Sequence, residues 1–323
     1  MAKICYNKMK PTQVAGCSPA TFWDKEMKTV KIKAYAKVNL TLEIVGESGG
    51  YHMLDSLVAS VDIFDLIVLK KRKDKLSCVT MKGMNSESIP PENNNALKAA
   101  EAFSGAFGCT GADITIYKNI PMGAGLGGSS ADASGVLVGM AKLYEINDKT
   151  GLETLANTIG SDVKYMLDGG FARMQGRGDI VEKLPLSKEL YFLMILPNTG
   201  VSSGACYREY DREPQSLQAG ATEKCINALM LGDEKGAGRY LTNDLYPPAS
   251  RLCNDVKRAY EEALSFSPLG VVMTGSGSAV LAMFETKELC GWAKSRYRGK
   301  YKTAVVKTVI PTDEKIWKNP FVI

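Results

Sequence analysis

A glycine- and serine-rich run near the middle of the chain has the composition of an anion-binding loop. Residues 121–134 read PMGAGLGGSSADAS, and apolar residues follow at helical spacing up to Tyr144. Glycine leaves room for backbone amides to approach an oxyanion, and the start of a helix adds partial positive charge. Ser129 and Ser130 could supply hydroxyl contacts. The pattern predicts a phosphate-binding loop.

Other interpretations of the same letters remain open at this stage. Gly123, Gly125 and Gly128 spell GxGxxG, the turn of a Rossmann dinucleotide site. Against that interpretation, Pro121 and Met122 separate the glycines from the preceding strand-like stretch, and the loop lies far from the start of the chain. The GxxxxGK[ST] pattern of a Walker loop is absent from the sequence. A glycine-rich turn with a serine cap is the simplest alternative.

Composition narrows the class of protein. The chain has 323 residues, 45% of them hydrophobic and 23% charged, which is ordinary for a globular protein of two units or one large domain. No apolar run approaches the ~20 residues of a membrane-spanning helix, so we expect no membrane partner. The net charge of +5 comes from scattered residues, which predicts a small anionic substrate and no nucleic-acid partner. The oligomeric state stays open.

Side chains on which many enzymes depend are scarce. His52 is the only histidine, which argues against zinc hydrolases and Ser-His nucleophiles. The 8 cysteines are widely spaced, without a CxxC pair, and we expect reduced thiols in a cytoplasmic protein. The first residues do not resemble a secretory signal.

The periodicity of apolar residues predicts the elements that would position the loop. Alternation indicates strands, and a 3.6-residue repeat indicates helices. The expected strands cover residues 30–45, 57–69, 113–120, 191–196, 270–274, 279–284 and 301–309, with a hairpin over 169–186. The expected helices cover residues 96–107, 133–144, 152–159, 222–231, 250–264 and 285–296, and residues 90–95 are expected to form a loop.

Several sequence blocks resemble the GHMP kinases. Residues 121–131 are similar to the PxxxGLGSSA signature of that superfamily. The blocks AKVNLTLEIVG (36–46) and GGYHMLDSL (49–57) narrow the resemblance to the 4-diphosphocytidyl-2-C-methyl-D-erythritol kinases. Three more blocks, IGSDVKYMLDGGFARMQGRG, LPNTGVSSGACY and MTGSGSAVLAMF, follow in that family's order. The resemblance therefore covers residues 31–309, nearly the whole chain.

This resemblance implies a two-domain GHMP kinase fold of the α+β or α/β class. The N-terminal ATP-binding domain, expected over residues 29–186, would resemble ribosomal protein S5 domain 2. The C-terminal domain, expected over residues 187–323, would be a ferredoxin-like α+β unit. Residues 1–28 would be an N-terminal appendage. ATP and the acceptor would meet in the cleft between the two domains.

The resemblance also implies a reaction, the ATP-dependent phosphorylation of the 2-hydroxyl of 4-diphosphocytidyl-2-C-methyl-D-erythritol in the non-mevalonate isoprenoid pathway. A hydroxyl that attacks phosphorus must lose its proton, and the family pattern assigns the base to Asp162. Lys37 would favour the ionised carboxylate and steady developing negative charge. Without the resemblance, Asp162 would be an ordinary helix-cap aspartate and Lys37 an outward-facing strand residue.

Acceptor binding is implied for residues from four segments. In the family pattern the ring of Tyr51 stacks on cytosine, His52 reads the base edge, and Tyr207 is the second aromatic wall. Base stacking on an aromatic ring contributes about 1 to 3 kcal/mol. The full implied set is Asn39, Tyr51, His52, Tyr207, Thr274, Gly275 and Ser276. Taken alone, these would be structural tyrosines, a surface histidine and turn residues.

Nucleotide binding is implied for the glycine loop and two flanking residues. Asn94 would lie near adenine, and Lys118 could reach the nucleotide. Mg²⁺ would accompany ATP as a charge shield, although no dedicated carboxylate cage for a metal is visible in the sequence. The implied ATP-binding residues are Pro121, Met122, Gly123, Ala124, Gly125, Leu126, Gly127, Gly128, Ser129, Ser130, Ala131, Asn94 and Lys118.

The chain departs from the family pattern at three places. Its loop reads GLGGSSAD where the family has GLGGGSSD, so Ser129 replaces a glycine and Ala131 replaces a serine. Lys164 stands where the family has proline, and Asn95 occupies a usually apolar position. Three alternatives stay open: a GHMP kinase for another small alcohol, such as homoserine or mevalonate, a nicotinamide-dependent Rossmann oxidoreductase, and a non-catalytic ATP sensor of the same fold. The presence of Lys37 and Asp162 argues against the sensor.

Overall fold

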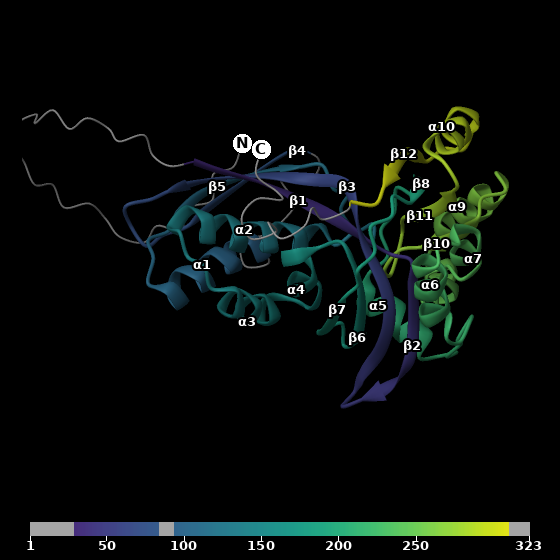
Figure 1. Cartoon of the computed structure of the whole chain (residues 1–323), viewed down its shortest axis with the longest axis horizontal. Helices are drawn as coiled ribbons and strands as arrows, with labels where there is room; N and C mark the ends of the chain where they lie inside the picture. The colour runs from purple at the N-terminus through teal and green to yellow at the C-terminus, as the bar shows by residue number, and fades with distance from the viewer. Residues whose placement is uncertain (1–28, 84–93, 310–323) are drawn as a thin grey trace, which may run out of the picture.

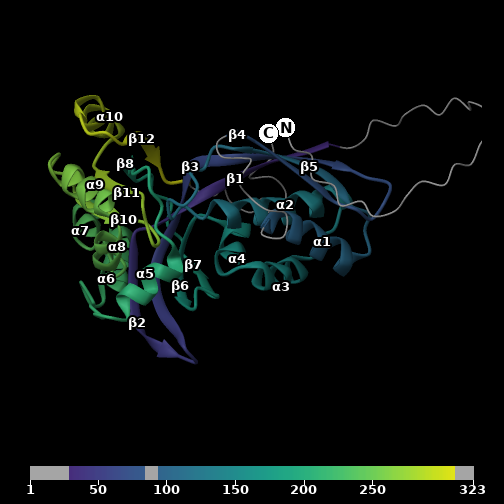
Figure 2. The ribbon, with the colours of Figure 1, turned by 180° about the vertical axis from the view of Figure 1, so that it is seen from behind.

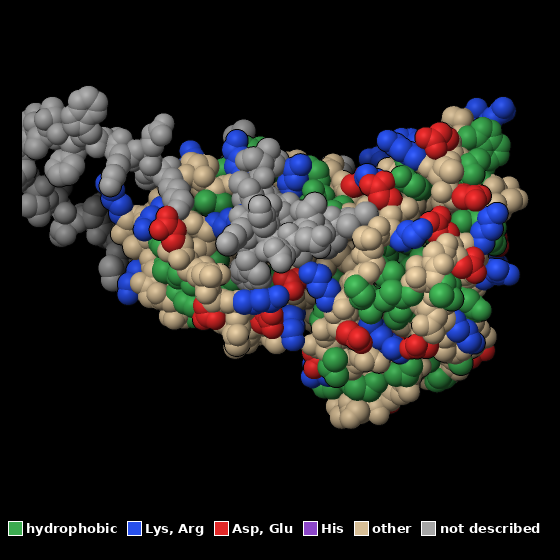
Figure 3. Space-filling view, viewed as in Figure 1, with side chains coloured by type: hydrophobic (Ala, Val, Ile, Leu, Met, Phe, Trp, Pro, Cys, Tyr) green, Lys and Arg blue, Asp and Glu red, His purple; other side chains and the backbone are tan. Residues whose placement is uncertain are grey.

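Two β-sheets, each covered by helices, build the molecule (Figure 1). The computed structural model describes residues 29–83 and 94–309. The expected appendage 1–28 and most of the expected loop 90–95 lie outside these residues. Within them, no helix is long and apolar enough to cross a bilayer. On the face drawn in Figure 3, acidic and basic side chains are interspersed rather than gathered into fields of one sign.

The first sheet is organised around one long central strand. Strand β3 (Tyr51–Lys71) pairs antiparallel with β1 (Thr29–Asn39) and with β2 (Thr41–Ser48). The expected strand 30–45 is therefore confirmed but breaks at Leu40, between β1 and β2. In β1 the alternating apolar residues are buried and the residues between them are more exposed, as half-buried strands require. The register of β1 shifts between Tyr35 and Lys37.

The remaining elements of the first sheet come from distant parts of the chain. One of them, the short β9, lies parallel to β2, so a later segment contributes to the first sheet. Figure 2 shows the helices of this lobe beneath the sheet. The strands are β4 (Cys78–Gly83), β5 (Ala112–Lys118), β6 (Phe171–Gly176), β7 (Ile180–Lys183) and β9 (Thr242–Asn243). The helices are α1 (Asn95–Phe107), α2 (Gly128–Tyr144), α3 (Lys149–Ile159) and α4 (Ser161–Asp168).

The second sheet has the strand order of a ferredoxin-like unit. Its four antiparallel strands lie in the order β10-β11-β8-β12, which is the chain order 2-3-1-4. These strands are β8 (Tyr191–Leu196), β10 (Gly270–Met273), β11 (Val280–Phe284) and β12 (Lys302–Lys307). Helices α9 (Asn254–Leu264) and α10 (Lys287–Arg296) pack on this sheet. The other helices of this lobe are α5 (Ser203–Tyr210), α6 (Ala221–Met230), α7 (Glu234–Arg239) and α8 (Tyr246–Leu252).

One expected helix is wrong. Residues 250–264 form parts of two helices, because Cys253 adopts an extended conformation (φ −143°, ψ 102°) between α8 and α9. The first of these helices begins earlier than expected, with prolines in its first turn. Proline is tolerated there because first-turn amides have no partner within the helix. The helices α4, α5 and α7 were not expected, since each spans only 6 to 8 residues.

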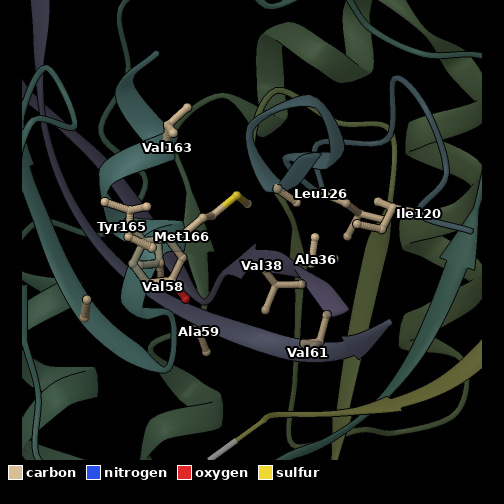
Figure 4. Close-up of a cluster of buried hydrophobic side chains, with 14 of the residues drawn as sticks. Ala36, Val38, Val58, Ala59, Val61, Ile120, Leu126, Val163, Tyr165 and Met166 are labelled. Carbon is tan, nitrogen blue, oxygen red and sulfur yellow. The ribbon is translucent and has the colours of Figure 1, made fainter. Parts of the chain in front are cut away.

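A buried cluster anchors the glycine loop to β1 and α4 (Figure 4). Leu126, at the centre of the loop, is 1% exposed and packs in the same core as Ala36 of β1 and Met166 of α4. The backbone amide of Lys37 donates to the carbonyl oxygen of Leu126 at 3.1 Å. The loop, β1 and α4 are thereby held together. This packing fixes the relative positions of the polar side chains on β1 and α4, such as Lys37 and Asp162.

Candidate active site

The glycine loop bends by backbone conformations that favour glycine. Gly123, Gly125 and Gly127 have φ values of 67°, 78° and 70°. Helix α2 begins directly after them, and its first backbone bond runs from the Ala131 amide to the Gly127 carbonyl at 2.9 Å. The amides of the three residues before Ala131 have no partner within the helix. These free amides at the N-terminus of α2 can donate to the oxygens of a phosphate group.

The loop is the floor of the first of two pockets. Besides loop residues, the start of α1 and the end of β5 line this pocket. Asn94 is the N-cap of α1 and accepts from the amides of Ala96 and Leu97 at 3.0 and 3.3 Å. Asn95 donates from Nδ2 to Ser129 Oγ at 3.0 Å and so connects α1 to the loop. Glycines, small polar groups and apolar side chains such as Met81, Ile120 and Met122 therefore line the pocket together.

Lys118 lies in a wall of this pocket within a buried ionic cluster. Its ammonium group contacts Asp65 Oδ2 and lies 2.6 Å from Asp132 Oδ2. Asp65 also accepts the backbone amides of Asn119 and Ile120 through Oδ1. Within the described residues Asp132 Oδ1 has no hydrogen-bond partner. Burial raises the pKa of the Asp132 carboxyl well above its ordinary value, although the Lys118 charge opposes the shift.

Lys37 and Asp162 lie side by side at the edge of the loop. The distance from Lys37 Nζ to Asp162 Oδ2 is 3.5 Å, and the two side chains are 8% and 30% exposed. A register shift in β1 directly before Lys37 re-aims the strand at this point. Asp162 stands in the first turn of α4, whose N-terminal dipole favours a carboxylate. Lys37 is thus buried, not an outward strand residue.

Asn39 joins this pair to the turn between β10 and β11. Lys37 Nζ donates to Asn39 Oδ1 at 2.6 Å, and the Gly275 amide donates to the same oxygen at 3.1 Å. The backbone amide of Asn39 donates to Thr274 Oγ1 at 2.9 Å. The turn also lies directly on the glycine loop, since a Cβ on Gly125 would stand 2.1 Å from the Thr274 carbonyl oxygen. Both lobes therefore meet at the site.

A second pocket opens beside Lys37 and Asp162. Ser129 lines the first pocket, whereas its neighbour Ser130 lines the second. The stem of Lys37 lies against Gly127, where an added Cβ would approach it to 3.2 Å. The second pocket is lined by side chains from both lobes: Lys37, Asn39, Leu42, Leu54, Ser56, Ser130, Ser161, Asp162, Met174, Arg177, Gly178, Ser203, Tyr207, Leu245, Gly275 and Ser276. Lys37 and Asp162 both line the second pocket, and Lys37 also contacts the glycine loop that lines the first.

The aromatic residues expected to hold a base do not all face one another. The rings of His52 and Tyr207 stack at 4.9 Å with an interplanar angle of 24°, and His52 Nε2 lies 2.7 Å from Asp211 Oδ1. Tyr51 is 52% exposed and lies beneath the guanidinium of Arg177, outside the residues that line the second pocket. Burial raises the pKa of Tyr207 to about 12, so its hydroxyl stays protonated at neutral pH.

Five of the polar residues that were not expected from the sequence make contacts that shape the site. Asn243 donates from Nδ2 to the carbonyl oxygens of Met273 and Gly275 at 2.6 and 2.8 Å, and so holds the turn. The other four are Ser56, Asp65, Asp132 and Arg177. Asp132 and Arg177 fall inside the motif blocks, which offered a signal for them. Ser56 also falls inside one of these blocks, GGYHMLDSL, whereas Asp65 and Asn243 stand on strands with no local signature.

Comparison with known proteins identifies the family. The model for the GHMP kinases N terminal domain matches residues 94–172, and the model for the GHMP kinases C terminal domain matches residues 224–289. A 4-diphosphocytidyl-2-C-methyl-D-erythritol kinase of Carboxydothermus hydrogenoformans is 35% identical over 257 residues, covering 79% of this chain and 88% of that protein. The chain belongs to the 4-diphosphocytidyl-2-C-methyl-D-erythritol kinase family.

Two further relatives agree with this assignment. The kinase of the same name from Clostridium beijerinckii is 31% identical over 287 residues, covering 87% of this chain and 100% of that protein. A crystal structure of 4-(cytidine 5'-diphospho)-2C-methyl-D-erythritol kinase matches with a TM-score of 0.71 and 30% identity, covering 86% of this chain and 98% of the other. The protein is therefore an ATP-dependent kinase with the two GHMP domains.

The family assignment decides between the alternatives left by the sequence. The Rossmann interpretation is wrong, since β5, the strand before the loop, lies antiparallel to β3 in a sheet whose pairs are mostly antiparallel. A GHMP kinase for another alcohol is not favoured by these relatives. Within the described residues, no group of three or more His, Cys, Asp or Glu side chains could hold a metal.

Proposed function

We propose that this kinase transfers the γ-phosphate of ATP to the 2-hydroxyl of 4-diphosphocytidyl-2-C-methyl-D-erythritol, the acceptor named in its relatives. One observation carries the proposal. A carboxylate and an ammonium group, 3.5 Å apart, line the second pocket, and the lysine packs directly against the glycine loop that lines the first pocket. ATP would occupy the first pocket and the acceptor the second. The junction of the two domains is proposed near residue 186, between β7 and β8.

Asp162 would act as general base in this reaction. Its carboxylate accepts the proton of the 2-hydroxyl, the hydroxyl oxygen forms a bond to the γ-phosphorus, and the bond from that phosphorus to the β-γ bridging oxygen breaks to release ADP. Lys37 stabilises the ionised carboxylate and the negative charge that develops on the transferred group. The α2 amides hold the phosphate chain in line.

Mg²⁺ would enter with ATP rather than rest in a protein cage. Mg²⁺ usually binds through one or two carboxylates together with substrate phosphates and water. Asp162 and Ser130, which both line the second pocket, could supply oxygen ligands to the ion. When bound, the ion would neutralise charge on the phosphates. The widely spaced free thiols fit the proposed cytoplasmic location.

A coupled ADP-release assay with a panel of acceptors tests the proposal. The panel holds the cytidylated erythritol, the same alcohol without its cytidylyl group, homoserine and mevalonate. We expect turnover with the cytidylated acceptor alone, at a kcat/KM at least 100-fold above any other member. Preferred use of homoserine or mevalonate would replace the proposed acceptor, and hydrolysis of ATP without phosphorylated product would remove the proposed reaction.

A further inference from the structure

The turn between β6 and β7 carries a cation into the second pocket. Arg177 and Gly178 both line that pocket. The turn is held by the Arg177 amide, which donates to Asp179 Oδ1 at 2.8 Å, and by the β6-β7 pairing on either side. Gly176 and Gly178 flank Arg177 with φ values of 66° and 89°. The backbone under Arg177 is therefore fixed by the hairpin.

The guanidinium of Arg177 rests on an aromatic ring and not on a carboxylate. Its Cζ lies 3.7 Å from the ring centroid of Tyr51. Among the described residues, no acidic side chain forms an ion pair with it. Arg173, four residues earlier on β6, differs, because Asp55 and Glu223 both pair with it at 2.7 Å. Arg173 is thus neutralised within the fold, and the charge of Arg177 is not.

The two cations that line the second pocket are occupied differently. Lys37 donates to Asn39 Oδ1 and lies beside Asp162, so its charge is committed to the reacting end. Arg177 keeps its donors for another partner. A guanidinium offers several N–H groups in a fixed plane that suit phosphate oxygens, and stacking on an aromatic ring reduces the entropy lost when it binds.

We propose that Arg177 binds the diphosphate linkage of the cytidylated acceptor and selects acceptors that carry one. This inference rests on the proposed function, in which the second pocket holds an acceptor whose diphosphate joins the alcohol to the nucleoside. Tyr51 then supports the guanidinium from below. The residue acts on affinity for the acceptor and not on the transferred phosphate.

Steady-state kinetics of Arg177→Gln test the assignment, with Arg177→Lys as the conservative variant. A charge-assisted hydrogen bond contributes about 1.5 to 3 kcal/mol, so KM for the cytidylated acceptor should rise about 10- to 100-fold in Arg177→Gln. The kcat and the KM for ATP should stay within twofold, and Arg177→Lys should recover part of the loss. Lys183→Gln, which removes a cation from the same hairpin outside the pocket, should match the wild type.

A binding experiment separates a diphosphate contact from a disturbed pocket. Calorimetry with cytidine diphosphate and with cytidine should show a loss of affinity in Arg177→Gln for the diphosphate alone. Equal losses for both probes, or no loss for either, would overturn the assignment. A fall in kcat or a higher KM for ATP would move the guanidinium to the transferred phosphate and would also overturn it.

The same probes keep the two proposals apart. If the wild type fails to phosphorylate the cytidylated acceptor, the proposed function fails, and the two binding titrations still decide what Arg177 holds. If the wild type turns over and Arg177→Gln keeps an unchanged KM, the function stands and the assignment of Arg177 falls.

Discussion

The two pockets beside the glycine loop are built in opposite ways. The nucleotide-side pocket is formed chiefly by one continuous segment, residues 118–132, together with the start of α1. The acceptor-side pocket takes side chains from β1, β2, β3, the β6-β7 hairpin, α5 and the β10-β11 turn. Glycines and apolar residues make up much of the first lining, whereas the second contains more charged and polar side chains. Under the proposed function, one local segment would bind the phosphate chain of ATP, whereas the acceptor would contact residues of both lobes.

The largest effect on turnover is expected from a substitution of Asp162. Asp162→Asn keeps the shape of the side chain but removes the base, so kcat should fall by about 10² to 10⁴. The Kd for ATP should change less than twofold, because the nucleotide-side pocket does not include Asp162. Stopped-flow and nucleotide-binding titrations measure the two quantities. Asp168→Asn, at the other end of α4, is the control, and unimpaired turnover of Asp162→Asn would remove the base assignment.

The next largest effect is expected on stability, at the close contact between Gly125 and Thr274. Gly125→Ala places a Cβ 2.1 Å from the Thr274 carbonyl oxygen at a φ of 78°. Gly123→Ala is a matched control with a similar φ of 67°, where the nearest atom is 3.5 Å away. The positive φ alone is expected to lower the free energy of unfolding by about 1 to 3 kcal/mol in either variant. Urea denaturation should show a larger loss for Gly125→Ala. Equal losses would mean that the contact with Thr274 relaxes freely.

A smaller effect is expected on the acceptor side alone. His52→Ala removes the stack on Tyr207 and the contact with Asp211. The KM for the cytidylated acceptor should rise about tenfold, which corresponds to about 1.4 kcal/mol, and the KM for ATP should stay constant. Tyr210→Phe, which keeps the neighbouring ring, is the control. An unchanged KM for the acceptor would refute a role of His52 in base recognition.

The smallest effect concerns the buried acid on the nucleotide side. The pKa of Asp132 is higher in the folded protein than in the unfolded chain, so the folded protein binds more protons between the two pKa values. Stability should therefore fall as pH rises through that range. Asp132→Asn cannot ionise, and its free energy of unfolding relative to the wild type should increase from pH 5 to pH 8. Denaturant titrations of both proteins and of Glu153→Gln at each pH measure this. A decreasing difference would show that the ion pair with Lys118 outweighs burial.

The contiguous parts of the site were predictable from the sequence. The loop and the turn at Thr274 were expected at these positions, because glycine placement is a local signal. The helix after the loop was also expected, but α2 begins at Gly128, five residues before the expected start of the helix over 133–144. The expected general base and its lysine partner rested on the family resemblance. Alternation on β1 indicated a strand but not the burial of Lys37, which depends on the loop that covers it.

The rest of the site depends on contacts between distant residues. The cluster of Asp65, Lys118 and Asp132 joins three elements, and no spacing in the chain predicts it. The stack of His52 on Tyr207 joins residues 155 positions apart, and β9 consists of 2 residues paired with β2. The break at Cys253 was also missed within the expected helix 250–264, although Asn254 and Asp255 beside it are weak helix formers.

The alternation of Ser129 and Ser130 between pockets limits how this loop can be redesigned. Each added residue turns a helix by about 100°, since 3.6 residues complete one turn. A single insertion ahead of Ser129 would move the Ser129 hydroxyl to the position that Ser130 now holds and would turn Ser130 away from the second pocket. Substitutions that keep the length of the loop are therefore a workable engineering route. A change in its length would displace the hydroxyl groups that face both pockets.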